Sequence, residues 1–152
     1  GTQSGEILGT IIRRNKTMTK LVMYGSRFGG PSTAPTVIRC IADGLSTNTS
    51  LQEFVLANSQ LGDEGVSLLA QGLGSSNSCL QKLDLGNNGI SSIGIRALLD
   101  VIIERDSRIA DIDLSENAIG SEGASFLADA LGRNTVPHLT RLRLRWCNFG
   151  DD

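Results

Sequence analysis

The strongest constraint on the fold of this chain is an internal repeat with a period close to 30 residues. Each copy carries the pattern L-x-x-L-x-L-x-x-N-x-L, in which other apolar residues replace leucine and serine or cysteine replaces asparagine. Five copies occur, and their asparagine position falls on Ser26, Ser59, Asn88, Asn117 and Cys147. The steps between these positions are 33, 29, 29 and 30 residues. Such regular spacing indicates a chain built from stacked, equivalent units.

A second pattern follows most copies and predicts a helix. After Gly65, Gly94 and Gly123, apolar residues recur at spacings of three and four, which places them on one helical face. Most of these segments end in asparagine or aspartate three residues beyond an apolar residue, as at Asn15 and Asn48. These residues tolerate left-handed turns and suit a helix exit. Each unit is therefore expected to be a short strand, a turn, a helix and a second turn.

A single unit of this kind cannot bury both its strand stripe and its helix stripe. When the units stack, the strands form a parallel sheet, the helices cover its back, and the leucines lie between the layers. The asparagine, serine or cysteine is expected to bond backbone groups in the turn that leaves the strand. The first full unit is four residues longer, with an extended loop at 28–35, and Ser32 or Thr36 is expected to cap the next helix.

Two copies match the strand motif in full, at 80–90 and 109–119. With the 29-residue step and the full helix, they resemble the ribonuclease-inhibitor-type leucine-rich repeat, and the resemblance covers essentially the whole chain. It implies an α/β leucine-rich-repeat solenoid (horseshoe) of about five repeats, with a parallel β-sheet on the concave side and α-helices on the convex side. We expect 1–152 to be a single leucine-rich-repeat domain and, since neither end shows a polar cap, a fragment of a longer array.

The composition argues against several classes of function. Fourteen basic and sixteen acidic residues give a net charge of −2, which disfavours a nucleic-acid-binding chain. No apolar run approaches the ~18 residues of a transmembrane helix, so no membrane contact is expected. Cys40, Cys79 and Cys147 lie far apart, which favours reduced thiols in an intracellular, cytoplasmic protein, with a nuclear location also open.

The sequence contains no motif for catalysis or cofactor binding. His138 follows a proline in a turn, and no motif places a Ser or Cys nucleophile beside it. The cysteines lack the C-x-x-C spacing of a zinc site, and the glycines belong to repeat turns rather than to a phosphate-binding loop. A charge ladder explains Asp84, Asp111 and Asp113 more simply than a metal cluster does. We therefore expect no catalytic residue, cofactor, metal ion or small-molecule substrate.

Residues between the strand leucines are expected to point into the concave surface. Equivalent positions stack ~4.8 Å apart along the sheet, so the sequence defines four columns of side chains. The first column alternates in charge, which predicts a self-paired ladder. The second places Asp84 beside Asp113, an unfavourable pair unless a cation bridges them, and Arg143 next to Asp113 is the expected bridge. In chain order the columns are Lys20, Glu53, Lys82, Asp111 and Arg141; Val22, Val55, Asp84, Asp113 and Arg143; Tyr24, Ala57, Gly86, Ser115 and Arg145; and Gly25, Asn58, Asn87, Glu116 and Trp146.

The two ends of this surface are candidates for partner binding. An apolar patch of Val22, Tyr24, Val55 and Ala57 is expected at one end, and a basic, aromatic edge at the other. Tryptophan, arginine and tyrosine are enriched among interface anchors, so the basic edge is expected to contact a partner with acidic groups. The alternative is that an adjoining repeat would pair with the arginines and pack on the tryptophan. The candidate partner-binding residues are Tyr24, Val55, Asp84, Asp113, Glu116, Arg141, Arg143, Arg145 and Trp146.

The resemblance and the absence of catalytic motifs together predict a protein–protein interaction module that is not an enzyme. Its partner is expected to be a protein that contacts the concave face and its rims. Relatives of other kinds leave alternatives open: a regulator resembling the Ran GTPase-activating protein, a ligand-sensing segment of a NOD-like immune receptor, or an actin-regulatory domain of tropomodulin type. No motif carries over the catalytic residues of the GTPase activator, and a GTPase-stimulation assay separates that reading from simple binding.

Overall fold

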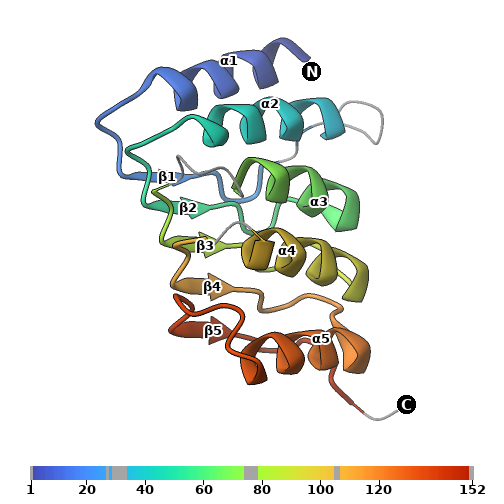
Figure 1. Ribbon diagram of the computed structural model, residues 1–152. Coiled ribbons are helices and arrows are strands. Elements are labelled where there is room, and N and C mark those ends of the chain that lie inside the picture. Colours follow the sequence, from blue (N-terminus) through green and yellow to red (C-terminus); the bar gives the residue numbers. More distant parts are fainter. Residues whose placement is uncertain (1, 27, 29–33, 74–78, 105–106, 151–152) are drawn as a thin grey trace.

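The computed structural model describes residues 2–26, 28, 34–73, 79–104 and 107–150. Within these residues, helices and short strands alternate along the chain (Figure 1). Every strand has three residues and every helix has twelve or thirteen. The elements are α1 (Thr2–Arg14), β1 (Lys20–Val22), α2 (Ala34–Ser46), β2 (Glu53–Val55), α3 (Gly62–Leu73), β3 (Lys82–Asp84), α4 (Ser92–Glu104), β4 (Asp111–Asp113), α5 (Gly120–Gly132) and β5 (Arg141–Arg143).

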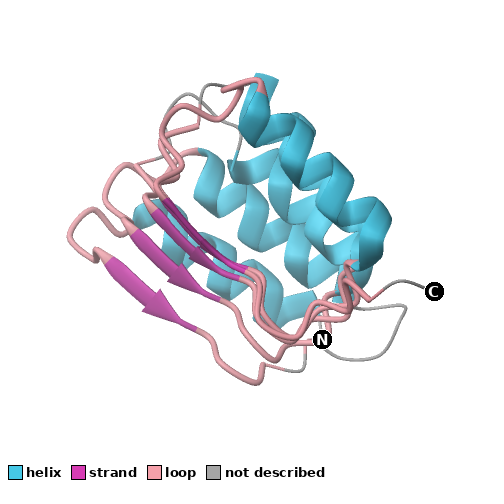
Figure 2. Cartoon of the chain, turned by 90° about the horizontal axis from the view of Figure 1, so that it is seen from below, coloured by secondary structure: helices cyan, strands magenta, loops and turns pink. Residues whose placement is uncertain are grey.

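The strands form one parallel sheet in the order β1-β2-β3-β4-β5. All the helices lie on one side of this sheet, and its other side is open, as Figure 2 shows from below. The expected α/β solenoid is therefore confirmed, and we call the open side the concave face. One of the two candidates for the helix cap in the long first unit was wrong. Thr36 lies inside α2, which begins at Ala34, so it does not cap that helix; Ser32 lies outside the described residues.

The apolar core lies between the sheet and the helix layer. Leucine or another apolar side chain from the middle of each strand and from the following turn points into this space, as alternation along a strand requires. Burying a side chain of this size stabilises the fold by about 1.5–3 kcal/mol. At the three central strands these residues are almost completely buried: Phe54, Leu56, Leu83, Leu85, Ile112 and Leu114.

The buried asparagines join each unit to the unit before it. Asn88 Nδ2 donates to the carbonyls of Leu56 (2.9 Å) and Gly86 (3.2 Å), and Asn88 Oδ1 accepts from the N–H of Ser59 (2.9 Å). Asn117 repeats the arrangement one unit later, because its Oδ1 accepts from the N–H of Asn88 at 2.9 Å. The predicted role of this position in the turn is confirmed.

Serine and cysteine fill the same position with fewer bonds. Ser59 Oγ donates to the carbonyl of Met23 at 3.2 Å, and Cys147 Sγ donates to that of Leu114 at 3.4 Å. Burial raises the pKa of the Cys147 thiol, which keeps it protonated and therefore able to donate. The thiol thus serves the fold as a donor rather than as a reactive group.

A second set of asparagines closes the turns that leave the helices. Asn48 Nδ2 donates to the carbonyls of Ile12 and Asn15, and Asn48 Oδ1 accepts from the N–H of Leu51 at 2.7 Å. Asn15 Oδ1 accepts from the N–H of Met18 at 2.6 Å. These bonds confirm the predicted helix-exit role and connect α1 to the chain that follows α2.

Glycines set how closely the first helices approach one another. A Cβ atom on Gly72 would lie 2.2 Å from the carbonyl oxygen of Ala42 in α2, and one on Gly44 would lie 2.6 Å from that of Gly9 in α1. Only a residue without a side chain fits such contacts. Gly72 lies seven residues after Gly65. The equivalent positions, seven residues after Gly94 and Gly123, are Val101 in α4 and Ala130 in α5.

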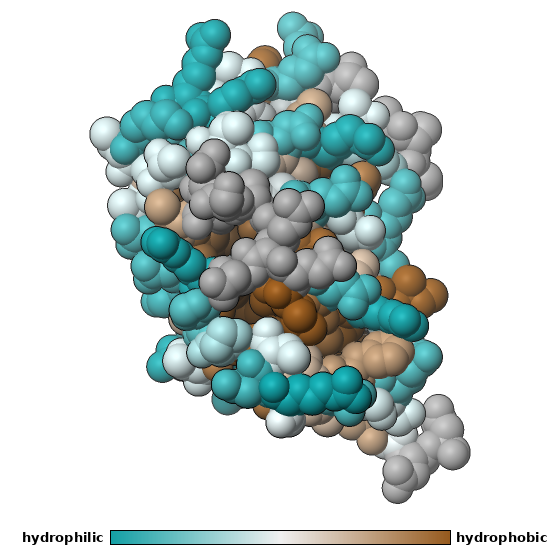
Figure 3. Space-filling model, in the orientation of Figure 1, coloured by the Kyte–Doolittle hydropathy of each residue, from teal (hydrophilic) through white to brown (hydrophobic). Residues whose placement is uncertain are grey.

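A hollow of about 430 Å³ opens between α4 and α5, and Ala130 is one of the residues that line it. Its apolar lining includes Leu99, Ile103, Phe126 and Ala130, and Figure 3 shows hydrophobic colour between these two helices. The guanidinium of Arg96 lies 5.5 Å from the centre of the Phe126 ring, in cation–π range. α4 and α5 pack less closely than α1 and α2 do, and helix spacing depends on the side chains at the contact.

We predict that Gly72→Ala destabilises the protein by about 1–3 kcal/mol, because the added methyl group forces α3 away from α2. Urea denaturation measures the change in the free energy of unfolding. Gly132→Ala in α5 is the matched control: no atom lies within 4 Å of its Cβ position, and alanine favours the helix by up to about 1 kcal/mol. Equal effects of the two substitutions would contradict the close-contact interpretation.

We predict that Asn88→Ala costs about 3 kcal/mol or more, since it leaves buried groups of Ser59, Leu56 and Gly86 without their partner. Asn88→Ser should cost less, because a hydroxyl serves this position at Ser59. Free energies of unfolding from denaturant titration check both values. A loss below about 0.5 kcal/mol for Asn88→Ala would place it among ordinary surface substitutions and refute the structural role.

Candidate functional site

The strand register brings the first two predicted columns together as expected. Lys20, Glu53, Lys82, Asp111 and Arg141 are successive partners across the sheet. Lys20 Nζ lies 2.8 Å from Glu53 Oε1, and this contact holds the pKa of the Glu53 carboxyl below its ordinary value, with smaller contributions from the charges of Lys20 and Lys82. The alternating charges are therefore paired within the chain at this end of the ladder.

Asp111 is the centre of a charge cluster at the other end. Its side chain is only 10% exposed, and Asp111 Oδ2 accepts from Arg141 Nη1 at 3.3 Å and from Arg143 Nη2 at 3.1 Å. Arg143 Nη1 also lies 3.5 Å from Asp113 Oδ2. Two of the three candidate arginines, Arg141 and Arg143 of β5, are thus paired with carboxylates of β4. The expected bridge between Asp84 and Asp113 was wrong, because among the described residues Arg143 joins Asp113 to Asp111 instead.

The two neighbouring aspartates of the second column are held by the backbone. Asp84 Oδ1 accepts from the N–H of Gly86 at 3.0 Å, and Asp113 Oδ1 accepts from the N–H of Ser115 at 2.9 Å. Hydrogen bonds to carboxylates offset the repulsion of like charges. In the described part of the chain, no group of three or more His, Cys, Asp or Glu side chains is placed to hold a metal ion.

Arg145 and Trp146 differ from the paired arginines. Trp146 is 79% exposed and has a φ of 52°, in the left-handed region that large residues adopt at a cost of about 1–3 kcal/mol. The N–H of Arg145 donates to Ser115 Oγ at 3.2 Å, while its side chain is exposed. Both residues line an open hollow of about 670 Å³ together with Glu116 and half-buried Leu144.

The opposite end presents a smaller apolar patch than expected. Tyr24 and Val22 are 68% and 53% exposed, and Val22 pairs with the half-buried Val55. Ala57 is buried, so it adds no surface to the patch. Four strand spacings of ~4.8 Å separate the two ends, or roughly 19 Å. The structure therefore does not gather the candidate residues into one compact cluster.

The sequence placed Asn58 and Asn87 in the fourth column of the concave face, but their exposed carboxamides were not counted among the candidate binding residues. Asn87 Nδ2 donates to Asn58 Oδ1 at 3.0 Å, and Asn58 Nδ2 lies 3.5 Å from Tyr24 Oη. Both residues have positive φ, as do all members of their column: Gly25 (65°), Asn58 (59°), Asn87 (50°), Glu116 (61°) and Trp146 (52°). Glycine and asparagine at three of these positions were the available signal, since both tolerate left-handed backbone.

Comparison with known proteins identifies the family. The sequence model described as "Leucine Rich repeat" matches residues 47–70, 76–99, 111–128 and 137–152, which together make up more than half of the chain. The protein belongs to the leucine-rich-repeat family. No curated protein sequence gives a significant match. No helix among the described residues is both long enough and apolar enough to cross a membrane.

Two solved structures illustrate the same fold. One is titled "Leiomodin-1 Actin-Binding Site 2" and aligns with a TM-score of 0.75 at 18% identity, over 92% of this chain and 78% of that one. The other is the tropomodulin C-terminal domain of Caenorhabditis elegans, with a TM-score of 0.74 at 16% identity, over 95% and 84% of the two chains. At these identities the likeness shows the fold alone.

We predict that Lys20→Met raises the pKa of Glu53 toward its ordinary value, because the hydrogen bond from Lys20 is the largest cause of the lowered pKa. A carboxyl ¹³C NMR titration measures it. Lys82→Met, which removes a weaker charge effect, should raise the pKa less. A lowered pKa stabilises the fold above the unfolded value of about 4.3, and this contribution is lost as pH falls through the folded value. An unchanged Glu53 titration in Lys20→Met would contradict the pairing.

Proposed function

We propose that this chain is a protein-binding module and that its partner contacts the concave face at the edge formed by Arg145 and Trp146. The observation that carries the proposal is the exposed, conformationally strained Trp146 beside an arginine that forms no ion pair among the described residues. The repeat imposes this left-handed backbone on every unit, and a tryptophan there costs more than the glycine or asparagine that other units place at the same position. Tryptophan and arginine together are the residues most enriched among interface hot spots.

The internal pairing of the other arginines narrows the binding surface. Arg141 and Arg143 contact Asp111, so a partner would have to compete with a largely buried carboxylate for them. Arg145 requires no such exchange, and its charge is available to an acidic group on the partner. Glu116 lines the same hollow as Arg145 and Trp146, and Tyr24 and Val55 form the outer part of the proposed surface at its other end.

We further infer that the repeats are of the ribonuclease-inhibitor type, because units of about 30 residues each place a full α-helix behind the sheet. On this proposal the chain acts by binding and not by catalysis, without a cofactor and inside the cell. The free, mutually distant cysteines agree with a reducing compartment.

Affinity capture with the intact chain tests the proposal. We predict that Arg145→Ala/Trp146→Ala lowers recovery of specific partners at least tenfold, since hot-spot residues contribute about 2 kcal/mol or more each. Ile93→Ala/Arg133→Ala is the matched control, because both residues are exposed on the helix layer. Equal recovery with wild type and the Arg145/Trp146 variant, at equal thermal stability, would refute the proposed surface.

Actin is the first purified protein to test as a partner. The support is the similarity to the leiomodin-1 domain, whose title names an actin-binding site. Binding of labelled actin monomers to the intact chain, measured by fluorescence anisotropy and weakened by Arg145→Ala/Trp146→Ala, would support this assignment. Absence of binding at micromolar concentrations would reject actin as the partner. The capture experiment would then be the test of the proposed binding surface.

A further inference from the structure

We propose that an extended peptide segment of the partner binds across the ends of the strands, from Tyr24 to Trp146. Its backbone groups form hydrogen bonds with the carboxamides of Asn58 and Asn87. The inference rests on the proposed function and specifies the form that the partner takes at this surface. We call the line of Tyr24, Asn58, Asn87, Glu116 and Trp146 the rim.

Four of the five rim residues share one backbone conformation, and Tyr24 is the exception. From Asn58 to Trp146, each residue of the column has a φ between 50° and 61°, directly before the buried position of its unit. Because the strands are in register, this conformation presents the side chains in one row, one strand spacing of ~4.8 Å apart. All four of these residues are exposed. The row is therefore a regular feature of the solenoid and does not depend on any single loop.

The two carboxamides retain unused hydrogen-bonding capacity. A carboxamide has two N–H donors and an oxygen with two acceptor sites. Asn87 uses one N–H on Asn58, and no described residue donates to Asn87 Oδ1. Asn58 accepts that bond and has only the long contact to Tyr24 Oη at 3.5 Å. One free acceptor beside free donors matches the N–H and C=O groups of an extended peptide.

The dimensions suit a short extended segment. Four strand spacings separate Tyr24 from Trp146, roughly 19 Å, which an extended chain covers with about six residues at ~3.3 Å each. Between these aromatic residues the adjacent column contains Ala57, Gly86 and Ser115, whose small side chains leave room for a single chain above the strand ends.

The charges along the rim predict the sequence of the bound segment. The unpaired Arg145 lies next to Trp146, whereas Glu116 occupies the rim between Asn87 and Trp146. An acidic residue of the bound peptide is therefore favoured near Trp146 and disfavoured next to Glu116. Tyr24 and Trp146 favour apolar or aromatic residues at the two ends of the segment.

Selection from a phage-displayed library of random 12-residue peptides on the intact chain tests the inference. We expect enriched peptides to contain two apolar or aromatic residues about five to seven positions apart, with an acidic residue near one of them. The dissociation constants of the synthesised peptides are then measured by fluorescence anisotropy. Asn58→Gly/Asn87→Gly should raise these constants about tenfold, because it removes both carboxamides while glycine keeps the left-handed backbone.

Gln60→Gly is the matched control, since Gln60 is exposed with a φ of 54° but lies outside the rim. It should leave peptide binding unchanged, and circular dichroism melting should show all variants folded. Failure of any peptide to enrich, or enriched peptides that bind Asn58→Gly/Asn87→Gly as tightly as wild type, would overturn the inference.

The capture experiment separates this failure from that of the proposed function. If a captured partner depends on Arg145 and Trp146 but is indifferent to Asn58→Gly/Asn87→Gly, the partner binds as a folded surface: the peptide mode is wrong and the proposed function stands. If capture does not depend on Arg145 and Trp146 at all, the proposed function itself fails.

Discussion

The fold depends on how each turn after a strand satisfies its backbone groups. When the chain bends away from the sheet, its N–H and C=O groups lose their ladder partners, and leaving them buried and unpaired would cost free energy. Asn88 and Asn117 supply the missing partners and bond both to their own turn and to the unit before it. Because each asparagine spans two units, it fixes the position of one unit relative to the next. The parallel register of the sheet then follows unit by unit.

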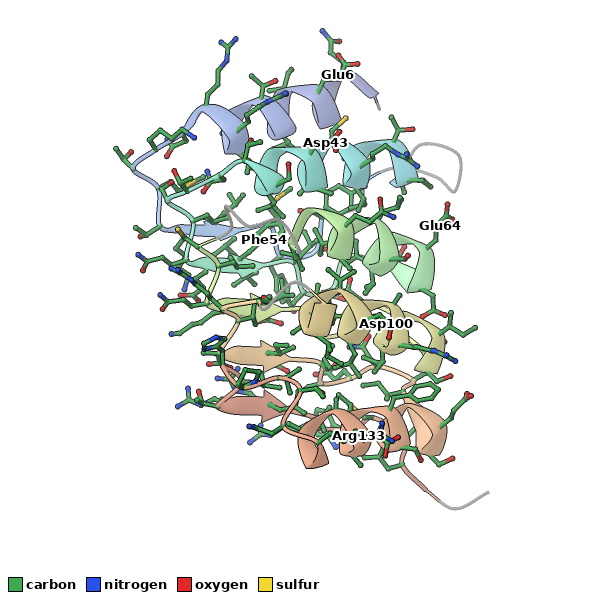
Figure 4. The ribbon with its side chains drawn as sticks, in the orientation of Figure 1. Glu6, Asp43, Phe54, Glu64, Asp100 and Arg133 are labelled. Carbon is green, nitrogen blue, oxygen red and sulfur yellow. The ribbon has the colours of Figure 1, made fainter. Side chains whose placement is uncertain are left out.

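Because of that register, equivalent residues of successive units lie side by side on the concave face. Residues 29, 30 or 33 positions apart become neighbours, so the charge ladder from Lys20 to Glu53 and the cluster around Asp111 form between units. Figure 4 shows the side chains of the successive units. The same repetition gives the rim its row of left-handed residues. Ion pairs and hydrogen bonds within the chain hold several side chains of this surface in place. Side chains that are ordered before a partner binds lower the entropic cost of binding.

Most of the fold was predictable from the sequence, whereas the detail of the site was only partly so. Spacing alone located the strands, the concave columns and the buried asparagines, because each depends on one repeated constraint. Spacing did not predict that Arg143 would contact Asp111 as well as its register partner Asp113, since a long side chain reaches diagonal neighbours. The left-handed column was missed because its members range from Gly25 to Trp146 in size. The hollow between the last two helices needs three-dimensional contacts, not periodicity, to be recognised.

The most direct test of this account is a measurement of the strand register by NMR, from nuclear Overhauser effects between backbone protons of neighbouring strands. The account predicts contacts that link Val22 to Val55, Val55 to Asp84, Asp84 to Asp113 and Asp113 to Arg143, all in the parallel pattern. A register displaced by one residue would turn the columns over and place the leucines on the open face. Either such a displacement or an antiparallel pattern of contacts would contradict the structure and every inference drawn from its concave face.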